Sequence, residues 1–132
     1  MSVLKLGIPK GSLEKATIEL FAKSGWEIKL TSRNYFPEVD DPELSCSICR
    51  PQEMSAYVES GMLDAGITGK DWTMENGSDI VVVEELIYSK VSKKPTRWVI
   101  AVAGDSGITR VEELQGKRIA TELVTVTRRF FA

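Results

Sequence analysis

Four short segments of the sequence carry residue types that bind phosphate groups. One combines an ammonium group, a glycine backbone and a hydroxyl, two carry an arginine after an apolar run, and one is a small polar turn. Cations and free backbone N–H groups together suit phosphate or pyrophosphate. Each segment alone also fits a solvated cation or an ordinary turn, but their joint presence favours an anion site. The candidate residues are Lys10, Gly11, Ser12, Arg33, Arg50, Thr68 and Gly69.

Other site chemistries find little support in this sequence. It contains no histidine, which removes the usual general base and any Ser-His or Cys-His nucleophile pair. Cys46 and Cys49 form a Cys-x-x-Cys motif. On a strand they would point to opposite faces, and no second pair completes a zinc site, so we interpret both as small buried apolar residues. The acidic segment 38–43 is interpreted as a solvated loop, and no metal-ligating residue is predicted.

Composition limits the class of protein. A chain of 132 residues with 42% hydrophobic and 27% charged residues is expected to form a packed core. Its net charge of −2 argues against a protein that coats nucleic acid. No apolar run approaches the length of a membrane span, and no signal peptide is visible. We therefore expect a cytoplasmic protein with no nucleic-acid or membrane partner.

Strand-like and helix-like segments alternate, which is typical of an α/β fold with a largely parallel sheet. In residues 13–24 the apolar positions recur at helical spacing, Ser12 is the expected N-cap, and Gly25 ends the helix. Pro51 is well placed to start a second helix, which Gly61 ends. The predicted strands are 4–8, 27–31, 44–50, a short strand after Asp64, and 80–84.

A polar, basic linker at residues 89–96 suggests two lobes. We place the first α/β lobe at residues 1–94 and the beginning of a second at 95–132. The second is expected to contain strands at 97–103 and 117–121 and a helix from Val124. Between the two strands, Thr109 and Glu112 are expected to form a capping box ahead of a short helix.

The order of elements predicts where the candidate residues lie. Ligands of open α/β sheets bind beyond the carboxyl ends of the strands, and each candidate segment follows a predicted strand. We therefore expect the segments to meet at one edge of one sheet. By strand alternation, Arg50 is expected on the same face as Cys46 and Ile48, so that a charge emerges at the border of an apolar face.

Four segments, in this order, resemble the catalytic subunit of ATP phosphoribosyltransferase, which opens histidine biosynthesis. They are residues 6–13 (LGIPKGSL), Arg50-Pro51, residues 64–71 (DAGITGKD) and residues 114–121 (LQGKRIAT). The resemblance runs from one end of the chain to the other, and the combination is specific where a single motif would not be.

The resemblance implies a fold like the type II periplasmic binding proteins, with two α/β lobes and a cleft between them. It implies a glycosyltransferase reaction that joins ATP to phosphoribosyl pyrophosphate, releases pyrophosphate and uses Mg²⁺ with its phosphorylated substrates. Arg33 and Arg50 would bind substrate phosphates, Lys10 would lie beside them, and Thr68-Gly69 would line the cleft. Family members form homo-oligomers, and a short form requires a regulatory subunit.

The sequence also departs from the family pattern. Glu122-Leu123-Val124 replaces a frequent Tyr-Pro, and the phosphoribosyl pyrophosphate loop would come after residue 132. We therefore expect an N-terminal portion of the enzyme, with an incomplete second lobe and no activity by itself. Two alternatives remain open: a non-enzymatic module that binds small anions on the same architecture, and a structural fragment that assembles with a partner chain.

Overall fold

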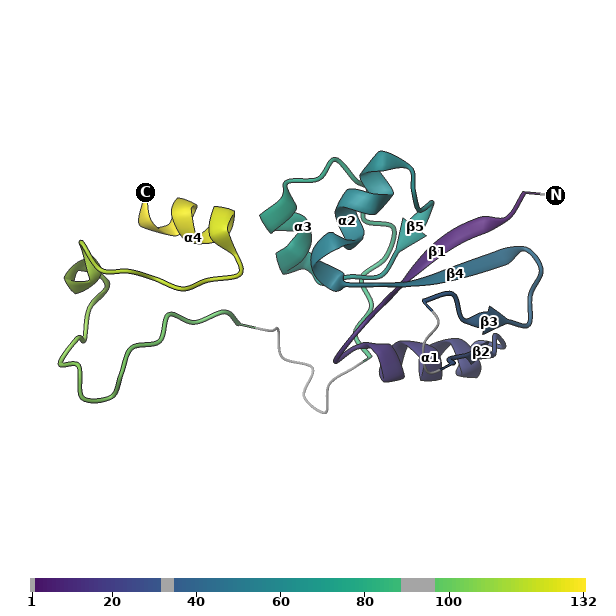
Figure 1. Ribbon diagram of the computed structural model, residues 1–132, viewed down its shortest axis with the longest axis horizontal. Coiled ribbons are helices and arrows are strands. Elements are labelled where there is room, and N and C mark those ends of the chain that lie inside the picture. The colour runs from purple at the N-terminus through teal and green to yellow at the C-terminus, as the bar shows by residue number, and fades with distance from the viewer. Residues whose placement is uncertain (1, 32–34, 89–96) are drawn as a thin grey trace.

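A three-stranded parallel sheet forms the centre of the computed structural model, which describes residues 2–31, 35–88 and 97–132 (Figure 1). Its strand order is β4-β1-β5, with β1 at Leu4–Pro9, β4 at Leu44–Cys49 and β5 at Ala65–Gly66. Leu6 lies opposite Cys46 on one side and Ala65 on the other. Helix α1 covers one face of this sheet, and α2 and α3 lie on the other side (Figure 1). The predicted α/β class with a parallel sheet is confirmed.

The main apolar core lies between the sheet and α1, which spans Glu14–Lys23. Apolar side chains of β1 and β4 meet those of α1 there, as the helical spacing of residues 13–24 predicts. Thr17 is the buried polar residue of this helix, and its hydroxyl lies 2.7 Å from the Leu13 carbonyl and 2.6 Å from the Tyr88 hydroxyl. The buried cluster consists of Leu6, Ile8, Ile28, Cys46 and Ile48.

On the opposite face, α2 (Pro51–Ser60) packs close to the sheet because two strand positions are glycine. A Cβ atom at Gly66 would lie 2.7 Å from the Met54 sulfur, and one at Gly7 would lie 2.8 Å from the Leu63 side chain and closer still to Met54. Met54 fills this space and is 0% exposed. The two glycines therefore set the approach of α2 to β1 and β5.

Most helix ends lie where the sequence predicts them. Pro51 is the first residue of α2, and Gly61 ends it with a φ of 84°, a left-handed conformation that suits glycine. Helix α3 spans Lys70–Asn76 and begins directly after Gly69. The prediction of Ser12 as the N-cap of α1 is wrong, because that position is taken by Leu13 and no side chain caps the helix.

The second predicted strand joins a different sheet. Strand β2 (Ile28–Lys29) pairs antiparallel with β3 (Glu38–Val39), and neither belongs to the parallel sheet. Carboxylates of the acidic segment hold this hairpin together: Asp41 accepts a 2.9 Å hydrogen bond from the Trp26 indole, and Asp40 accepts one of 3.0 Å from the Glu27 amide. The indole bond lowers the pKa of Asp41. The segment is therefore partly structural rather than only solvated.

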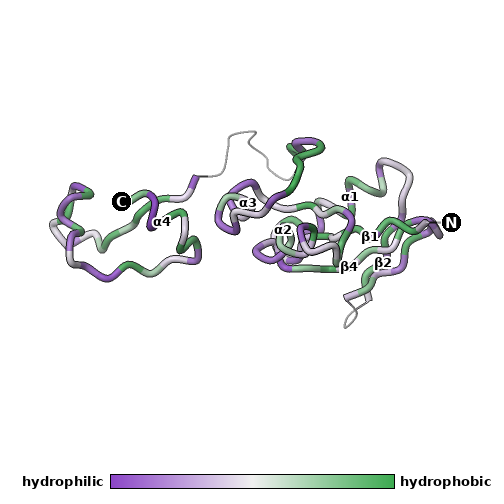
Figure 2. Tube along the Cα trace, turned by 90° about the horizontal axis from the view of Figure 1, so that it is seen from above, coloured by the Kyte–Doolittle hydropathy of each residue, from purple (hydrophilic) through white to green (hydrophobic). Residues whose placement is uncertain are grey.

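Three predicted strands do not form: 80–84, 97–103 and 117–121. A strand needs a neighbour to pair its backbone groups, and no described segment pairs with any of the three. Their apolar side chains are correspondingly exposed, with Val83 at 89% and Val99 at 73%. Figure 2 shows a hydrophobic stretch leading into the grey trace, which corresponds to the residues just before position 89. The expected lobe boundary between residues 94 and 95 lies outside the described residues.

The remaining C-terminal elements are short. A 3₁₀ helix, η1, spans Val111–Leu114, and α4 spans Val124–Phe131, which confirms the predicted helix start. The predicted capping box is wrong, because Arg110 occupies the N-cap and the Thr109 amide donates to Glu113 rather than Glu112, at 2.9 Å. No helix in the described part of the chain is long and apolar enough to cross a membrane.

Helix α3 packs against α2 on one side and against the C-terminal helix α4 on the other. Its Glu75 carboxylate accepts hydrogen bonds from the backbone amides of Thr125 (2.7 Å) and Val126 (2.9 Å), in the first turn of α4. One turn earlier on α3, Asp71 accepts a 2.7 Å bond from the Trp98 indole, whose ring packs edge-on against Trp72. Glu75 thus caps α4 from a distant part of the sequence, and its charge complements the helix dipole.

We expect the Glu75 contact to weaken on acidification. Desolvation acts to raise the pKa of the Glu75 carboxyl, but the amides of Val126 and Thr125 outweigh it and leave the pKa lowered. A lowered pKa means that the contact stabilises the fold above the ordinary carboxyl range and is lost as pH falls through the lowered value. The amide proton shifts of Thr125 and Val126 should therefore titrate below the usual glutamate range and cease to titrate in Glu75→Gln. A midpoint at the ordinary value would contradict this contact.

Candidate functional site

The three parallel strands end at one edge of the sheet and bring their following loops together. The Lys10 amide, just after β1, donates a 2.8 Å hydrogen bond to the carbonyl of Cys49, the last residue of β4. The Ile67 amide, just after β5, donates to the Gly7 carbonyl at 3.2 Å. Lys10 and Arg50 therefore start from adjacent backbone positions, as the parallel order predicts.

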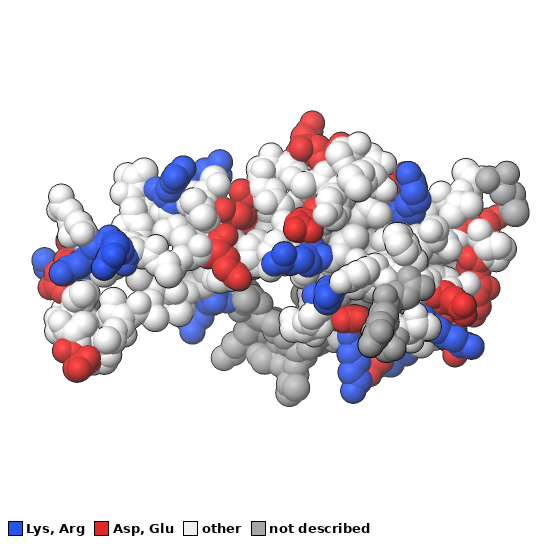
Figure 3. Space-filling view, viewed as in Figure 1, with Lys and Arg blue, Asp and Glu red and all other residues white. Residues whose placement is uncertain are grey.

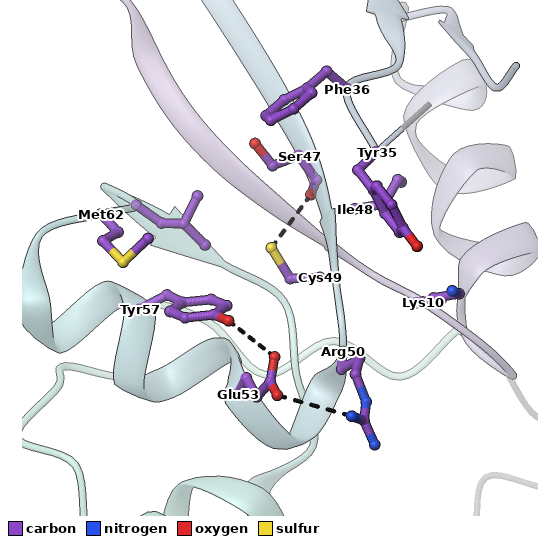
Figure 4. A pocket seen from close by; sticks show the side chains of 11 residues that line it. Lys10, Tyr35, Phe36, Ser47, Ile48, Cys49, Arg50, Glu53, Tyr57 and Met62 are labelled. Carbon is purple, nitrogen blue, oxygen red and sulfur yellow. Dashed lines mark hydrogen bonds and ion pairs between the residues drawn. The ribbon is translucent and has the colours of Figure 1, made fainter. Parts of the chain in front are cut away.

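A pocket of about 430 Å³ opens beside this edge (Figure 4). Both Lys10 and Arg50 line it, together with aromatic and sulfur-containing side chains from the segment before β4, from β4 itself and from α2. This combination of an apolar lining and a few polar groups is typical of small-molecule sites. Its lining residues are Lys10, Tyr35, Phe36, Ser47, Ile48, Cys49, Arg50, Glu53, Tyr57, Met62 and Leu63.

Arg50 lies at the mouth of this pocket as the N-cap residue of α2. Arg50 follows β4 with an extended backbone (φ −67°, ψ 134°), and the expectation that its side chain shares a face with Cys46 and Ile48 stays a prediction. The Arg50 side chain is 65% exposed, and one of its terminal nitrogens lies 3.9 Å from a carboxylate oxygen of Glu53. The guanidinium therefore remains accessible to an anion from solvent.

Two further α2 residues complete this corner of the pocket. Tyr57 donates a 2.9 Å hydrogen bond from its hydroxyl to the Glu53 carboxylate, four residues earlier on the helix. This bond, with the negative charge of Glu53, raises the pKa of Tyr57. Sequence reasoning missed Tyr57. The signal that could have found it is the helical spacing of positions 50, 53 and 57.

Lys10 reaches the pocket from the other side of β4 and packs against an aromatic ring. Its ammonium lies 5.3 Å from the centre of the Tyr35 ring, within cation–π range. Tyr35 is held on the open edge of β4, where its carbonyl accepts a 2.6 Å hydrogen bond from the Ile48 amide. In Figure 4, Lys10 lies beside Tyr35 to the right of β4 and Arg50 lies at the end of this strand, so both cations are near the same end of the pocket.

The other residues of the opening loop do not line this pocket. The Gly11 amide points to the Glu14 carboxylate at 3.5 Å, so an internal anion already faces the group expected to bind a phosphate. Gly11 has a φ of 99° and lines a separate hollow along α1, and Ser12 is exposed. Of the three residues in the loop, the structure brings only Lys10 to Arg50.

Thr68 and Gly69 lie at the same sheet edge but face the helices rather than the pocket. The Thr68 hydroxyl donates to the carbonyl of Pro51 at 2.8 Å, which ties the loop after β5 to the first turn of α2. Gly69 is the N-cap residue of α3. Both residues therefore hold α2 and α3 against the edge of the sheet.

Arg33 lies outside the described residues. The strand that precedes it, β2, belongs to the antiparallel pair with β3 and not to the parallel sheet. The argument that placed Arg33 at the same sheet edge as Lys10 and Arg50 therefore fails.

The two cysteines lie in different environments and neither is in a disulfide. Cys46 is buried in the core cluster, whereas Cys49 lines the pocket. Burial raises the pKa of both thiols, and the charge of Glu53 adds to this effect at Cys49. Both are therefore protonated at neutral pH and suit packing better than nucleophilic chemistry. Among the described residues, no three His, Cys, Asp or Glu side chains come together as a metal site.

Charge on the surface is mixed. On the face shown in Figure 3, lysine and arginine side chains are interspersed with aspartate and glutamate. Electrostatic attraction of an anion is therefore local to groups such as Arg50 and Lys10 rather than a property of the whole face.

Comparison with known proteins gives the same family from sequence and structure. Residues 50–132 match the HisG family, described as ATP phosphoribosyltransferase. ATP phosphoribosyltransferase of Solidesulfovibrio magneticus is 64% identical over 131 residues, which cover 99% of this chain and 45% of that protein. The enzyme of the same name from Nitratidesulfovibrio vulgaris, strain Hildenborough, is 65% identical over 129 residues, or 98% of this chain and 44% of the relative.

A solved structure agrees with this result. The fold matches a chain of the ATP phosphoribosyl transferase (HisG:HisZ) complex from Thermotoga maritima with a TM-score of 0.52 and 29% sequence identity, over 60% of this chain and 38% of that one. The chain thus spans less than half the length of the curated relatives that it matches. It belongs to the ATP phosphoribosyltransferase family.

Proposed function

We propose that this chain supplies one wall of the active site of an ATP phosphoribosyltransferase, the enzyme that opens histidine biosynthesis. In this reaction N1 of the ATP adenine attacks C1 of phosphoribosyl pyrophosphate, the C1–oxygen bond breaks, and pyrophosphate leaves with the bonding electrons. The observation that carries the proposal is the pair of cations, Lys10 and Arg50, at one apolar pocket in a chain 64% identical to enzymes of this name.

The proposed mechanism needs positioning and charge rather than a protein nucleophile. The sugar becomes cation-like in the transition state while negative charge builds on the departing pyrophosphate. Arg50, with its guanidinium exposed at the mouth of the pocket, would bind and neutralise that charge, and Lys10, which lies beside Tyr35, would contribute a second positive charge. Fixed cations that act where charge develops account for a large share of many enzymatic rate enhancements.

Other parts of the site are proposed from the family. A complete enzyme would have two α/β lobes of the type II periplasmic-binding-protein kind, with residues 1–94 in the first and 95–132 beginning the second. Arg33 would contribute a further cation and Thr68-Gly69 would line the cleft, whereas a contribution from the Gly11-Ser12 loop would require the Gly11 amide to leave the Glu14 carboxylate that it faces. Mg²⁺ would enter bound to the substrate phosphates, for which the described residues offer no three-ligand cluster of their own.

We also propose a cytoplasmic enzyme that forms homo-oligomers, with a regulatory subunit in the case of a short-form enzyme. The solved relative from Thermotoga maritima is a complex of two kinds of chain, which supports such a partner. The second candidate function is a non-enzymatic module that binds small anions, which the same pair of cations at an apolar pocket would also serve.

Turnover separates these two functions. We expect no formation of phosphoribosyl-ATP by the 132 residues alone, because the phosphoribosyl pyrophosphate loop of the family is not in this sequence. A longer protein that carries this sequence, with the remaining part of a relative such as the Solidesulfovibrio enzyme, should form phosphoribosyl-ATP from ATP and phosphoribosyl pyrophosphate. Turnover by the 132 residues would refute the first expectation. An inactive longer protein that still binds ATP would favour the binding module.

A further inference from the structure

Three side chains at the start of α2 form a continuous chain of contacts that ends on Arg50. The Tyr57 hydroxyl donates to one oxygen of the Glu53 carboxylate at 2.9 Å, and the other oxygen lies 3.9 Å from the Arg50 guanidinium. Figure 4 shows both contacts along the pocket wall. Because the residues stand at i, i+3 and i+7, one face of the helix carries all three.

An exposed arginine needs such support if it is to act in a defined place. Its side chain has many rotamers, and holding it still when a ligand binds costs conformational entropy at that moment. A carboxylate that already restrains the guanidinium removes part of this cost. An exposed ion pair alone is weak, whereas a carboxylate fixed by a second hydrogen bond restrains its partner better.

We propose that Glu53 and Tyr57 are positioning residues for Arg50: Tyr57 fixes the Glu53 carboxylate, and Glu53 holds the Arg50 guanidinium at the mouth of the pocket to receive a phosphate group. The inference rests on the proposed function, because it assigns Arg50 an anionic ligand. Neither Glu53 nor Tyr57 needs to touch that ligand.

The simpler interpretation treats Glu53 as an acid that stabilises the first turn of α2. Its place in that turn does favour the helix dipole. That role, however, gives the Tyr57 hydroxyl no effect on an anion in the pocket. The two interpretations therefore differ in what happens when only this hydroxyl is removed.

Tyr57→Phe is the decisive variant because it changes no charge and keeps the aromatic ring. Glu53→Gln would loosen Arg50, which weakens anion binding, but it also removes a negative charge near the anion, which strengthens binding. Because these two effects oppose each other, Glu53→Gln is used only as a second mutation combined with Tyr57→Phe. We expect Tyr57→Phe to weaken the binding of inorganic pyrophosphate to the 132-residue chain about three- to tenfold, measured by isothermal titration calorimetry. This loss corresponds to the interaction free energies found between residues of one hydrogen-bond network. Glu19→Gln, an exposed change on α1, is a control for altered net charge.

A double-mutant cycle shows whether Tyr57 acts through the chain of contacts. In an Arg50→Ala or Glu53→Gln background, Tyr57→Phe should no longer change the affinity for pyrophosphate. An equal loss of affinity in all backgrounds would mean that the hydroxyl touches the ligand or acts on the whole fold, and would overturn the proposal. Thermal unfolding of each variant shows whether the substitution has destabilised the whole fold.

A spectroscopic titration tests the contact without any ligand. The hydrogen bond to Glu53 raises the pKa of Tyr57, so the tyrosine absorbance of the chain should include one group that ionises late. That group should disappear in Tyr57→Phe and ionise earlier in Glu53→Gln. An unchanged titration in Glu53→Gln would overturn the inference.

The outcomes also separate this inference from the proposed function. If the unaltered chain binds pyrophosphate and Tyr57→Phe binds it equally well, the positioning role is wrong and the proposed function stands. If the unaltered chain does not bind pyrophosphate, the proposed role of Arg50 is contradicted, and the positioning role falls with it.

Discussion

Arg50→Ala in a complete enzyme that carries this sequence should lower kcat about 100-fold or more, the effect of removing a group that stabilises transition-state charge. The guanidinium lies at the mouth of the pocket and is 65% exposed, so substrate can reach it. If it acts mainly on the departing pyrophosphate, its loss should appear in kcat and in kcat/KM together. Steady-state assays of phosphoribosyl-ATP formation, with both substrates varied, measure the two constants.

The matched control is Arg110→Ala. Arg110 is similarly exposed, at 71%, and likewise lies near a carboxylate, 4.0 Å from Glu112, but outside the pocket. It should leave kcat unchanged. An Arg50→Ala enzyme with unaltered kcat and a raised KM would show that Arg50 binds substrate equally in ground and transition states. Unchanged constants would return Arg50 to a structural role.

Met54→Ala should lower the free energy of unfolding by about 2–5 kcal/mol, the range for large-to-small changes in a packed core. Met54 is 0% exposed and fills the space between α2 and the sheet. The residues beneath it are Gly7 and Gly66, which have no side chains to close the cavity. The loss should therefore fall in the upper part of the range, measured by urea unfolding with circular dichroism.

Met74→Ala is the control for this change. Met74 is 53% exposed on α3, so the same substitution removes little buried surface and should change the free energy of unfolding by less than about 0.5 kcal/mol. Equal effects of the two substitutions would mean that α2 does not pack on the sheet through Met54. A Met54→Ala loss below about 1 kcal/mol would mean the same.

Local sequence signals were sufficient for elements whose periodicity and ends are determined by their own residues. The helical spacing of residues 13–24 predicted α1, and Pro51 and Gly61 marked the two ends of α2. The apolar runs at 4–8 and 44–50 predicted β1 and β4, which pair in parallel along their whole length. These elements depend on periodicity and on the backbone preferences of single residues.

Pairing partners could not be read from local signals. Residues 80–84, 97–103 and 117–121 have strand-like composition but lack a described neighbour, and β2 pairs with β3 because carboxylates of Asp40 and Asp41 hold that hairpin. Composition records the preference of a segment for a strand, whereas a strand exists only when another backbone lies beside it.

In the candidate site, too, the sequence predicted what strand order determines and missed what tertiary contacts determine. Lys10 and Arg50 were predicted together because parallel strands align their carboxyl ends, and the 2.8 Å bond from the Lys10 amide to Cys49 shows that alignment. The aromatic lining was missed, since Tyr35 reaches the pocket through a tertiary contact with the edge of β4. Gly11 was assigned to the site from its loop alone, but its amide faces Glu14.

Calorimetric titration of the 132-residue chain with inorganic pyrophosphate tests the central claim most directly, namely that Arg50 and Lys10 form a phosphate-binding site at this pocket. The unaltered chain should bind pyrophosphate at one site, Arg50→Ala should lose most of that affinity, and Arg110→Ala should retain it. Binding that Arg50→Ala leaves unchanged would contradict the claim, as would the absence of binding by the unaltered chain.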